Sequence, residues 1–128
     1  MTVMSISMLI VEDKDNTLQA IRRMLEPLKL DIQTAQDGLD GLSKAKKDYY
    51  DIILIDHKMP VMDGLSLLKN LRELENYRNA PLLFMSTDSL VEVEPKALAA
   101  GATQCLSKPL DAEYLVDSVQ NWSAKAVA

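Results

Sequence analysis

Five short apolar runs, each followed by a stretch with helical periodicity, constrain the fold of this chain more than any other feature. The runs cover residues 6–11, 32–35, 52–55, 82–85 and 104–106. Strands that alternate with helices in this way build βαβ units. The first, third and fourth runs are almost continuously apolar, which is typical of parallel strands covered on both faces, whereas the other two indicate weaker or edge strands. We therefore expect an α/β fold with one doubly wound parallel sheet.

Apolar spacing also predicts helices between these strands. A first amphipathic helix is expected to start at an N-cap on Asp15 or Asn16 and to break near Pro27. In the last helix, Trp122 is expected to anchor the helix to the sheet. Further helices are predicted over residues 38–47, 64–74 and 111–124.

The fourth helix is predicted to be short. Pro95 lacks a backbone N–H and disfavours helical geometry at the residue before it, Glu94. We therefore expect this helix to begin near Pro95 and to end at Ala100, where Gly101 supplies a C-terminal stop.

Length and composition exclude several classes of protein. The 128 residues are predicted to form a single domain, 1–128. One cysteine and one histidine exclude an intrachain disulfide and the usual zinc sites. The net charge of −5 argues against direct nucleic-acid binding. Because no apolar stretch is long enough for a membrane span and no basic region precedes the first run, we expect a cytoplasmic protein.

Polar residues follow four of the predicted strands. Glu12 and Asp13 follow the first strand, Asp56 ends the third, Ser86 ends the fourth, and Lys108 follows the fifth. Open α/β sheets form their sites beyond the carboxyl ends of the strands, so these side chains are expected to meet there. A cluster of carboxylates without histidine favours Mg²⁺.

Such a site has a coherent chemistry. An aspartate beside a divalent cation can attack a phosphoryl group, since the cation offsets the repulsion between the two anions. Asp56 is the best placed nucleophile, Lys108 supplies a positive charge for the phosphoryl oxygens, and Ser86 supplies a hydroxyl donor.

The same residues give the chain a family resemblance. The segments 9–13 (LIVED) and 56–64 (DHKMPVMDG), together with Ser86 and the pair Lys108-Pro109, resemble bacterial response-regulator receiver domains in order and spacing. The match covers nearly the whole chain. It implies a flavodoxin-like, five-stranded parallel sheet in the order 2-1-3-4-5. It also implies a cis peptide bond between Lys108 and Pro109.

The resemblance assigns roles position by position. It makes Asp56 the phosphoacceptor of a two-component phosphorelay, with a sensor histidine kinase or phosphotransfer protein as donor and a downstream protein as partner. It makes Lys108 and Ser86 the phosphoryl contacts. The Mg²⁺ ligands that it implies are Glu12, Asp13, Asp56 and the backbone carbonyl of Lys58.

Several positions depart from the family pattern. Cys105 stands where the family usually has an aromatic ring that turns inward on activation, and we expect it to be a packed strand residue, not a redox sensor. Thr87 is bulkier than the usual residue and is expected to narrow access to the phosphoryl site. Lys58 and Asp88 flank that site and either pair across its opening or stand as separately solvated charges. Together with Pro95, Cys105 suggests an unusual output face and a partner other than a DNA-binding domain.

His57 directly follows the proposed phosphoacceptor. Because successive strand residues point to opposite faces, we expect His57 to point away from Asp56 and to be a surface or packed histidine, not a catalytic base.

Three other functions compete with a phosphorylatable switch. A receiver-like interaction module that works without phosphorylation is suggested by Cys105, Thr87 and Pro95. A phosphatase with an aspartate nucleophile commonly needs a second Asp two residues after the first, where this chain has Lys58, so we expect no turnover enzyme. A flavin-binding module is disfavoured by the acidic loop after the first strand.

Overall fold

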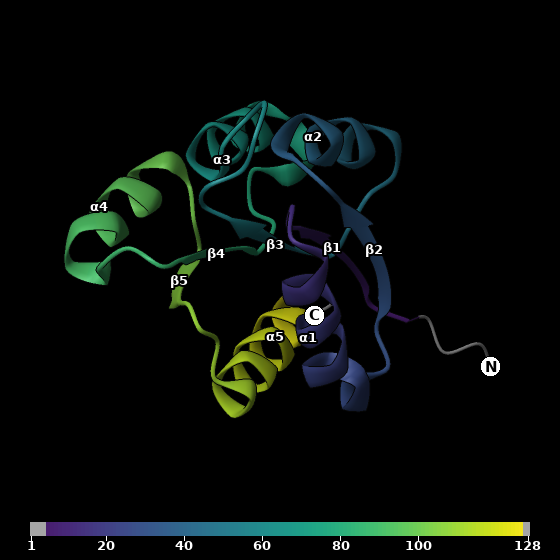
Figure 1. The fold of residues 1–128 in the computed structure, drawn as a ribbon. Coiled ribbons are helices and arrows are strands. Elements are labelled where there is room, and N and C mark those ends of the chain that lie inside the picture. The colour runs from purple at the N-terminus through teal and green to yellow at the C-terminus, as the bar shows by residue number, and fades with distance from the viewer. Residues whose placement is uncertain (1–4, 127–128) are drawn as a thin grey trace.

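The structure is a computed structural model that describes residues 5–126, and its centre is a five-stranded parallel sheet with helices on both faces (Figure 1). The strands are β1 (Ser7–Val11), β2 (Asp31–Ala35), β3 (Ile52–Asp56), β4 (Leu82–Ser86) and β5 (Gln104–Ser107). Their order across the sheet is β2-β1-β3-β4-β5, and every neighbouring pair is parallel. The five predicted strands and the implied order are therefore confirmed.

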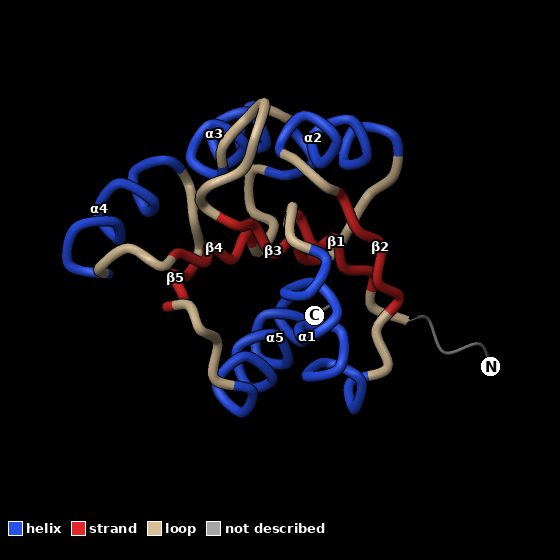
Figure 2. The backbone as a smooth tube through the Cα atoms, viewed as in Figure 1, coloured by secondary structure: helices blue, strands red, loops and turns tan. Residues whose placement is uncertain are grey.

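The helices form two layers around this sheet. In the tube view, α2, α3 and α4 lie on one side, and α1 and α5 lie on the other (Figure 2). Of the helices in the described part of the chain, none combines the length and the apolar character that crossing a membrane requires. The helices are α1 (Asp15–Leu25), α2 (Gly38–Lys47), α3 (Gly64–Glu73), α4 (Leu90–Ala100) and α5 (Ala112–Ala126), with short 3₁₀ turns η1 (Glu26–Leu28) and η2 (Glu75–Tyr77).

Alternation along the strands divides the core into two clusters. In β3, Ile53 and Ile55 pack toward α2, α3 and α4, whereas Ile52 and Leu54 pack toward α1 and α5. All four side chains are fully buried. Because successive strand residues point to opposite faces, an apolar run with no polar interruption is what a strand covered on both sides requires.

The fourth helix is longer than predicted. α4 begins five residues before Pro95, which lies inside the helix and is exposed. The carbonyl that loses its N–H partner belongs to Val91, a residue that is 86% exposed, so water can take the place of the missing donor. Burial of Val93 and Ala97 against the sheet supplies the stabilisation that outweighs the proline. The predicted stop is confirmed, because Gly101 has a φ of 117°.

The start of the first helix also differs from the prediction. The N-cap position of α1 is Lys14, not Asp15 or Asn16, and no side chain caps the helix from that position. Instead, the Lys14 backbone N–H donates to the carboxylate of Glu12 at 3.1 Å. The Glu12 carboxylate therefore orients the chain as it enters this helix. The break near Pro27 is confirmed, since α1 ends at Leu25.

Trp122 anchors α5 as predicted. Its ring packs against the core cluster on the α1 and α5 side, and its indole N–H donates to Oε1 of Gln104 at 2.7 Å. Gln104 is the first residue of β5, so this bond joins the last helix to the edge strand.

Candidate functional site

Three carboxylates meet at the carboxyl ends of two neighbouring strands, β1 and β3. Glu12 and Asp13 follow β1, Asp56 ends β3, and one oxygen from each lies within 4.8 Å of the others. Glu12 is only 2% exposed and Asp56 only 5%, whereas Asp13 is exposed. β1 and β3 are neighbours in the sheet, which explains why residues so far apart in sequence come together. The structure thus brings together the acidic residues that the sequence analysis grouped.

Lys108 supplies the cation of this cluster. It follows β5, and its peptide bond to Pro109 is cis, as the resemblance implied. Its Nζ donates to Oδ1 of Asp56 at 2.9 Å and to Oε2 of Glu12 at 3.2 Å. One ammonium group is therefore shared by two buried carboxylates.

Burial and neighbouring charges shift the pKa values of Glu12 and Lys108. Burial raises the pKa of Glu12, and the negative charge of Asp56 raises it further, against the opposing effects of the Lys14 N–H and of Lys108. For Lys108, burial lowers the pKa of the amine, but the hydrogen bonds and charges of Asp56 and Glu12 outweigh burial and leave the pKa raised. The three carboxylates of Glu12, Asp13 and Asp56 thus form an all-oxygen donor set that suits Mg²⁺.

The loop after β3 fits closely under the site. A Cβ on Gly64 would lie 2.3 Å from the backbone oxygen of Asp56 and 2.9 Å from the ring of Phe84. The backbone N–H of Gly64 donates to the carbonyl of His57 at 2.8 Å. Asp63 caps α3 by accepting from the Ser66 N–H at 2.9 Å. Only glycine allows this approach, which holds the backbone of Asp56 in place.

A second group of polar contacts surrounds Ser86 at the end of β4. Ser86 is 1% exposed, and its Oγ accepts from the backbone N–H of Asp88 at 3.0 Å. Its Oγ also lies 2.8 Å from Nδ1 of His57. No hydrogen bond joins Ser86 to Asp56 within residues 5–126.

The contact of His57 with Ser86 is the feature that the sequence analysis missed. The predicted packed histidine is confirmed, since its side chain is 13% exposed and its ring centroid lies 5.1 Å from that of Phe84. Phe84 belongs to the core cluster under α2, α3 and α4, and Ser86 follows it by two residues on the same strand. Period-two alternation on β4 therefore places the Ser86 hydroxyl on the face to which His57 points.

Lys58 and Asp88 pair across the opening, which was one of the two alternatives. Nζ of Lys58 donates to Oδ1 of Asp88 at 2.9 Å, although both side chains are substantially exposed. This hydrogen bond lowers the pKa of Asp88. Thr87, between Ser86 and Asp88, is exposed and lines a hollow of about 490 Å³ beside Lys108.

Cys105 is a buried residue of the sheet. It is 5% exposed, pairs with Phe84 in the register of β4 and β5, and belongs to the cluster under α4. Burial, with a smaller effect of the Glu94 charge, raises the pKa of its thiol to about 11. A thiol in this state is protonated at neutral pH and is a poor nucleophile, as expected for a packing residue.

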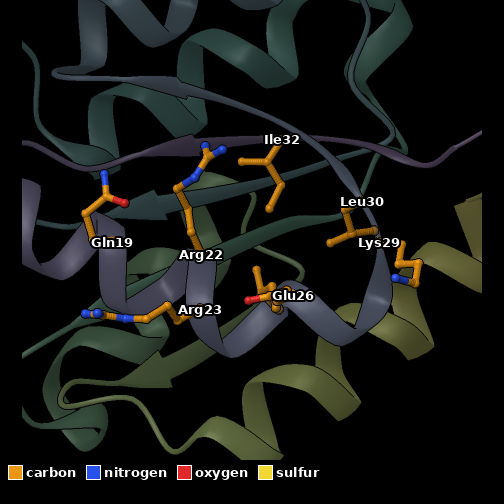
Figure 3. A pocket seen from close by; sticks show the side chains of 8 residues that line it. Gln19, Arg22, Arg23, Glu26, Lys29, Leu30 and Ile32 are labelled. Atoms are coloured by element: carbon orange, nitrogen blue, oxygen red, sulfur yellow. The ribbon is translucent and has the colours of Figure 1, made fainter.

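A separate hollow of about 440 Å³ lies between α1 and β2 (Figure 3). Apolar side chains, among them Leu30 and Ile32, are combined there with Arg22, Arg23 and Lys29. None of the clustered carboxylates lines this hollow. This hollow is therefore separate from the acidic cluster at the carboxyl ends of β1 and β3.

Comparisons with known sequences agree with this geometry. The family model described as "Response regulator receiver domain" matches residues 8–120. The chain is 30% identical over 118 residues to the probable transcriptional regulator ycf29 of Porphyra purpurea, which covers 92% of this chain and 56% of that protein. It is 32% identical over 110 residues to the sensor protein EvgS of Escherichia coli, which covers 86% of this chain and 9% of that protein. The chain thus spans a part of these curated relatives.

Solved structures share the fold over nearly the full chain. The chemotaxis protein CheY4 of Vibrio cholerae has a TM-score of 0.86 and 32% identity, with 93% of this chain and 99% of that chain covered. The receiver domain of the sensor histidine kinase PA1611 from Pseudomonas aeruginosa has a TM-score of 0.86 and 30% identity, with 94% and 99% covered. In that receiver domain, a magnesium ion is coordinated in the active-site cleft.

Proposed function

This chain belongs to the response-regulator receiver domain family and is a phosphoacceptor in two-component signalling, and we propose that Asp56 is the side chain that carries the phosphoryl group. The proposal rests on the two hydrogen bonds that the Lys108 ammonium donates to Asp56 and Glu12, beside the third carboxylate, Asp13. One oxygen of Asp56 accepts from Lys108, and the other, Oδ2, has no hydrogen bond to another described residue. Oδ2 is therefore free for attack on phosphorus.

We assign a Mg²⁺ site to the acidic cluster. Glu12, Asp13 and Asp56 offer oxygen ligands at mutually compatible distances, and the Lys58 carbonyl is proposed as a further ligand. The magnesium ion in the PA1611 receiver domain supports this assignment. When bound, Mg²⁺ would offset the repulsion between the carboxylates and an incoming phosphoryl group.

The transfer would form an acyl phosphate. Oδ2 of Asp56 attacks the phosphorus of a phosphohistidine, the O–P bond forms as the P–N bond breaks, and the donor nitrogen keeps the bonding electron pair. Lys108 stays protonated because its neighbours raise its pKa, so its positive charge faces the added negative charge. Ser86 offers a hydroxyl to a phosphoryl oxygen. Because the product is the phosphorylated domain itself, we propose that the chain is not a turnover enzyme.

Receiver domains act together with histidine kinases or phosphotransfer proteins, and the curated relatives include the hybrid histidine kinase G of Dictyostelium discoideum and the histidine kinase CheAY of Helicobacter pylori. We propose a kinase or phosphotransfer protein as the donor and a downstream protein as the recipient of the signal. The buried Cys105 leaves that signal to pass through the loop after β4 and through α4.

Intact-mass spectrometry after incubation with acetyl phosphate and Mg²⁺ tests this function. The unchanged protein is expected to gain one phosphoryl group, and Asp56→Asn is expected to gain none, because the nucleophilic carboxylate is gone. Asp117→Asn, which removes an exposed carboxylate on α5, is the matched control and is expected to behave as the unchanged protein.

A chelator is expected to abolish the adduct. An adduct that persists in Asp56→Asn would contradict the assignment of the acceptor. If the unchanged protein gains no phosphoryl group and also fails to bind beryllofluoride, a mimic of that group, the result would favour the interaction module that works without phosphorylation.

A further inference from the structure

His57 makes a buried contact that the transfer of the phosphoryl group does not use. Its ring packs against Phe84, and its Nδ1 lies 2.8 Å from the Ser86 hydroxyl. Its other neighbour is Asp88, whose Oδ2 lies 3.7 Å from Nδ1, beyond hydrogen-bond distance. The contact joins the residue after the proposed phosphoacceptor to the hydroxyl that the proposed function assigns to the phosphoryl oxygens.

A count of protons gives this contact a direction. The Ser86 hydroxyl has one proton to donate and two lone pairs, and one lone pair accepts from the Asp88 N–H at 3.0 Å. Within the described chain, Nδ1 of His57 is the acceptor within hydrogen-bond distance of that proton. Ser86 is 1% exposed, so bulk water does not offer an alternative. We therefore assign the hydroxyl as the donor to Nδ1, with the ring proton on Nε2.

We propose that His57 is a positioning residue that holds the Ser86 proton away from the phosphoryl site until Asp56 is modified. This inference rests on the function proposed above. A phosphoryl oxygen is charged and is a stronger acceptor than a neutral imidazole, so a phosphoryl group draws the hydroxyl toward itself. Because one proton cannot serve both acceptors, the bond between Ser86 and His57 breaks when the new one forms.

The exchange connects two loops. His57 begins the loop after β3, and Ser86 leads into the loop before α4. In the structure these loops are joined by the contact of His57 with Ser86 and by the pair of Lys58 with Asp88. Once the first contact is lost, the exposed pair of Lys58 with Asp88 is the remaining side-chain hydrogen bond between the two loops in the described chain. His57 thereby couples the state of Asp56 to the position of the loop before α4.

The competition predicts the effect of removing the imidazole. His57→Phe keeps a ring against Phe84 and removes the acceptor, so it is expected to tighten Mg²⁺-dependent beryllofluoride binding about fivefold, the worth of one net hydrogen bond. His57→Asn retains an acceptor near the position of Nδ1 and is expected to stay near the unchanged protein. In a Ser86→Ala background, His57→Phe is expected to change nothing. Unchanged binding in His57→Phe, or an equal effect in both backgrounds, would overturn the proposal.

A second measurement needs no variant. His57 is the one histidine in the sequence, so the imidazole signals in a nitrogen-15 NMR spectrum all come from its ring. We expect the proton on Nε2 and a hydrogen-bonded Nδ1 in the free protein, and a shift of the Nδ1 signal when beryllofluoride and Mg²⁺ are added. A proton on Nδ1, or a spectrum that does not respond, would overturn the role of His57 even if the variants fail to fold.

The two proposals fail in different ways. If beryllofluoride binds the unchanged protein and is lost in Asp56→Asn, the proposed function stands, and the His57 variants then decide the present inference. If no binding depends on Asp56, the phosphoryl site is wrong, and the role of His57 falls with it.

Discussion

The site has two halves that are built on different physical terms. The carboxylate half consists of Glu12, Asp56 and Lys108, whose contacts join charged groups that are almost entirely buried. The hydroxyl half consists of Ser86, His57 and Asp88 and contains one buried neutral contact beside an exposed charge. The two halves lie side by side, because Asp56 ends β3, Ser86 ends β4, and these two strands are neighbours in the sheet.

This difference between the two halves suggests that one mainly affects the stability of the protein and the other mainly affects switching. In the carboxylate half, each partner is needed to offset the charge of another, so loss of one leaves a buried charge uncompensated. In the hydroxyl half, each contact has a small net free energy, but a hydroxyl can change acceptors at little cost. We infer that charge balance among Glu12, Asp56 and Lys108 keeps the site folded, and that the acceptor of the Ser86 hydroxyl differs between the free and the phosphorylated state.

Removal of the Lys108 ammonium is expected to have the largest effect on stability. Lys108→Met leaves two buried carboxylates without their cation and is expected to lower the free energy of unfolding by about 3 kcal/mol near neutral pH. Urea denaturation in the presence of a chelator measures the loss. Lys69→Met, which changes an exposed lysine of α3, is the matched control and is expected to have no effect. A loss below about 1 kcal/mol for Lys108→Met would mean that water already screens this pair.

Mg²⁺ and pH test the charge balance without any variant. At a hundredfold excess over its Kd, the ion is expected to stabilise the protein by about 2.7 kcal/mol. Because the pKa of Glu12 is raised, a proton competes with the ion as the pH falls, so the gain in melting temperature should shrink as the pH is lowered toward that raised pKa. A gain that is independent of pH would contradict a role for Glu12 as a ligand.

Without Mg²⁺, Glu12 is expected to make the protein more stable, not less stable, as the pH falls. Between the ordinary pKa and the raised one, the folded state binds more protons at Glu12 than the unfolded chain does. The contribution of Glu12 to the free energy of unfolding therefore rises as the pH falls through that window. Melting curves recorded in chelator, with Glu12→Gln as the reference, isolate this contribution.

Loss of the hydroxyl is expected to have a smaller effect on stability. Ser86→Ala leaves the Asp88 N–H and the His57 ring without their partner, and should lower the free energy of unfolding by about 1 kcal/mol. Unlike the loss in Lys108→Met, this loss should be the same with Mg²⁺ and with chelator. Urea denaturation under both conditions makes the comparison, and a loss that depends strongly on Mg²⁺ would place Ser86 in the carboxylate half.

The exposed ion pair is expected to contribute least. Lys58→Met removes the partner of Asp88, but the Lys58 side chain is 68% exposed and solvent screens the pair. We expect no measurable change in the urea midpoint at either low or high salt. A clear loss of stability that salt suppresses would show that this pair, and not the buried hydroxyl, holds the two loops together.

Most of the carboxylate half was predictable from the sequence. Glu12, Asp56 and Lys108 are polar residues that end or follow apolar strands, and parallel strands bring their carboxyl ends to one edge of the sheet. The contact of His57 was not predicted, although alternation on β3 had correctly turned it away from Asp56. The sequence analysis considered alternation on β3 but not on β4. Alternation on β4 places Ser86 on the face that His57 reaches.

The fourth helix shows the limit of local rules. Pro95 disfavours a helix across it, and the prediction of a short helix followed from that preference alone. Burial of Val93 and Ala97 outweighs the missing hydrogen bond, and this burial exists only once the helix lies on the sheet.

The number of strands, the two apolar faces of the sheet and the kinds of side chain at its carboxyl edge could be predicted from the sequence, because they follow from local periodicity and motif order. Which of these side chains contact one another is visible only in the folded structure. The bonds of Lys108 to Asp56 and Glu12 span 52 and 96 residues, and the contact of His57 with Ser86 spans 29. Contacts over such separations depend on how strands pair and loops turn, which no local pattern encodes.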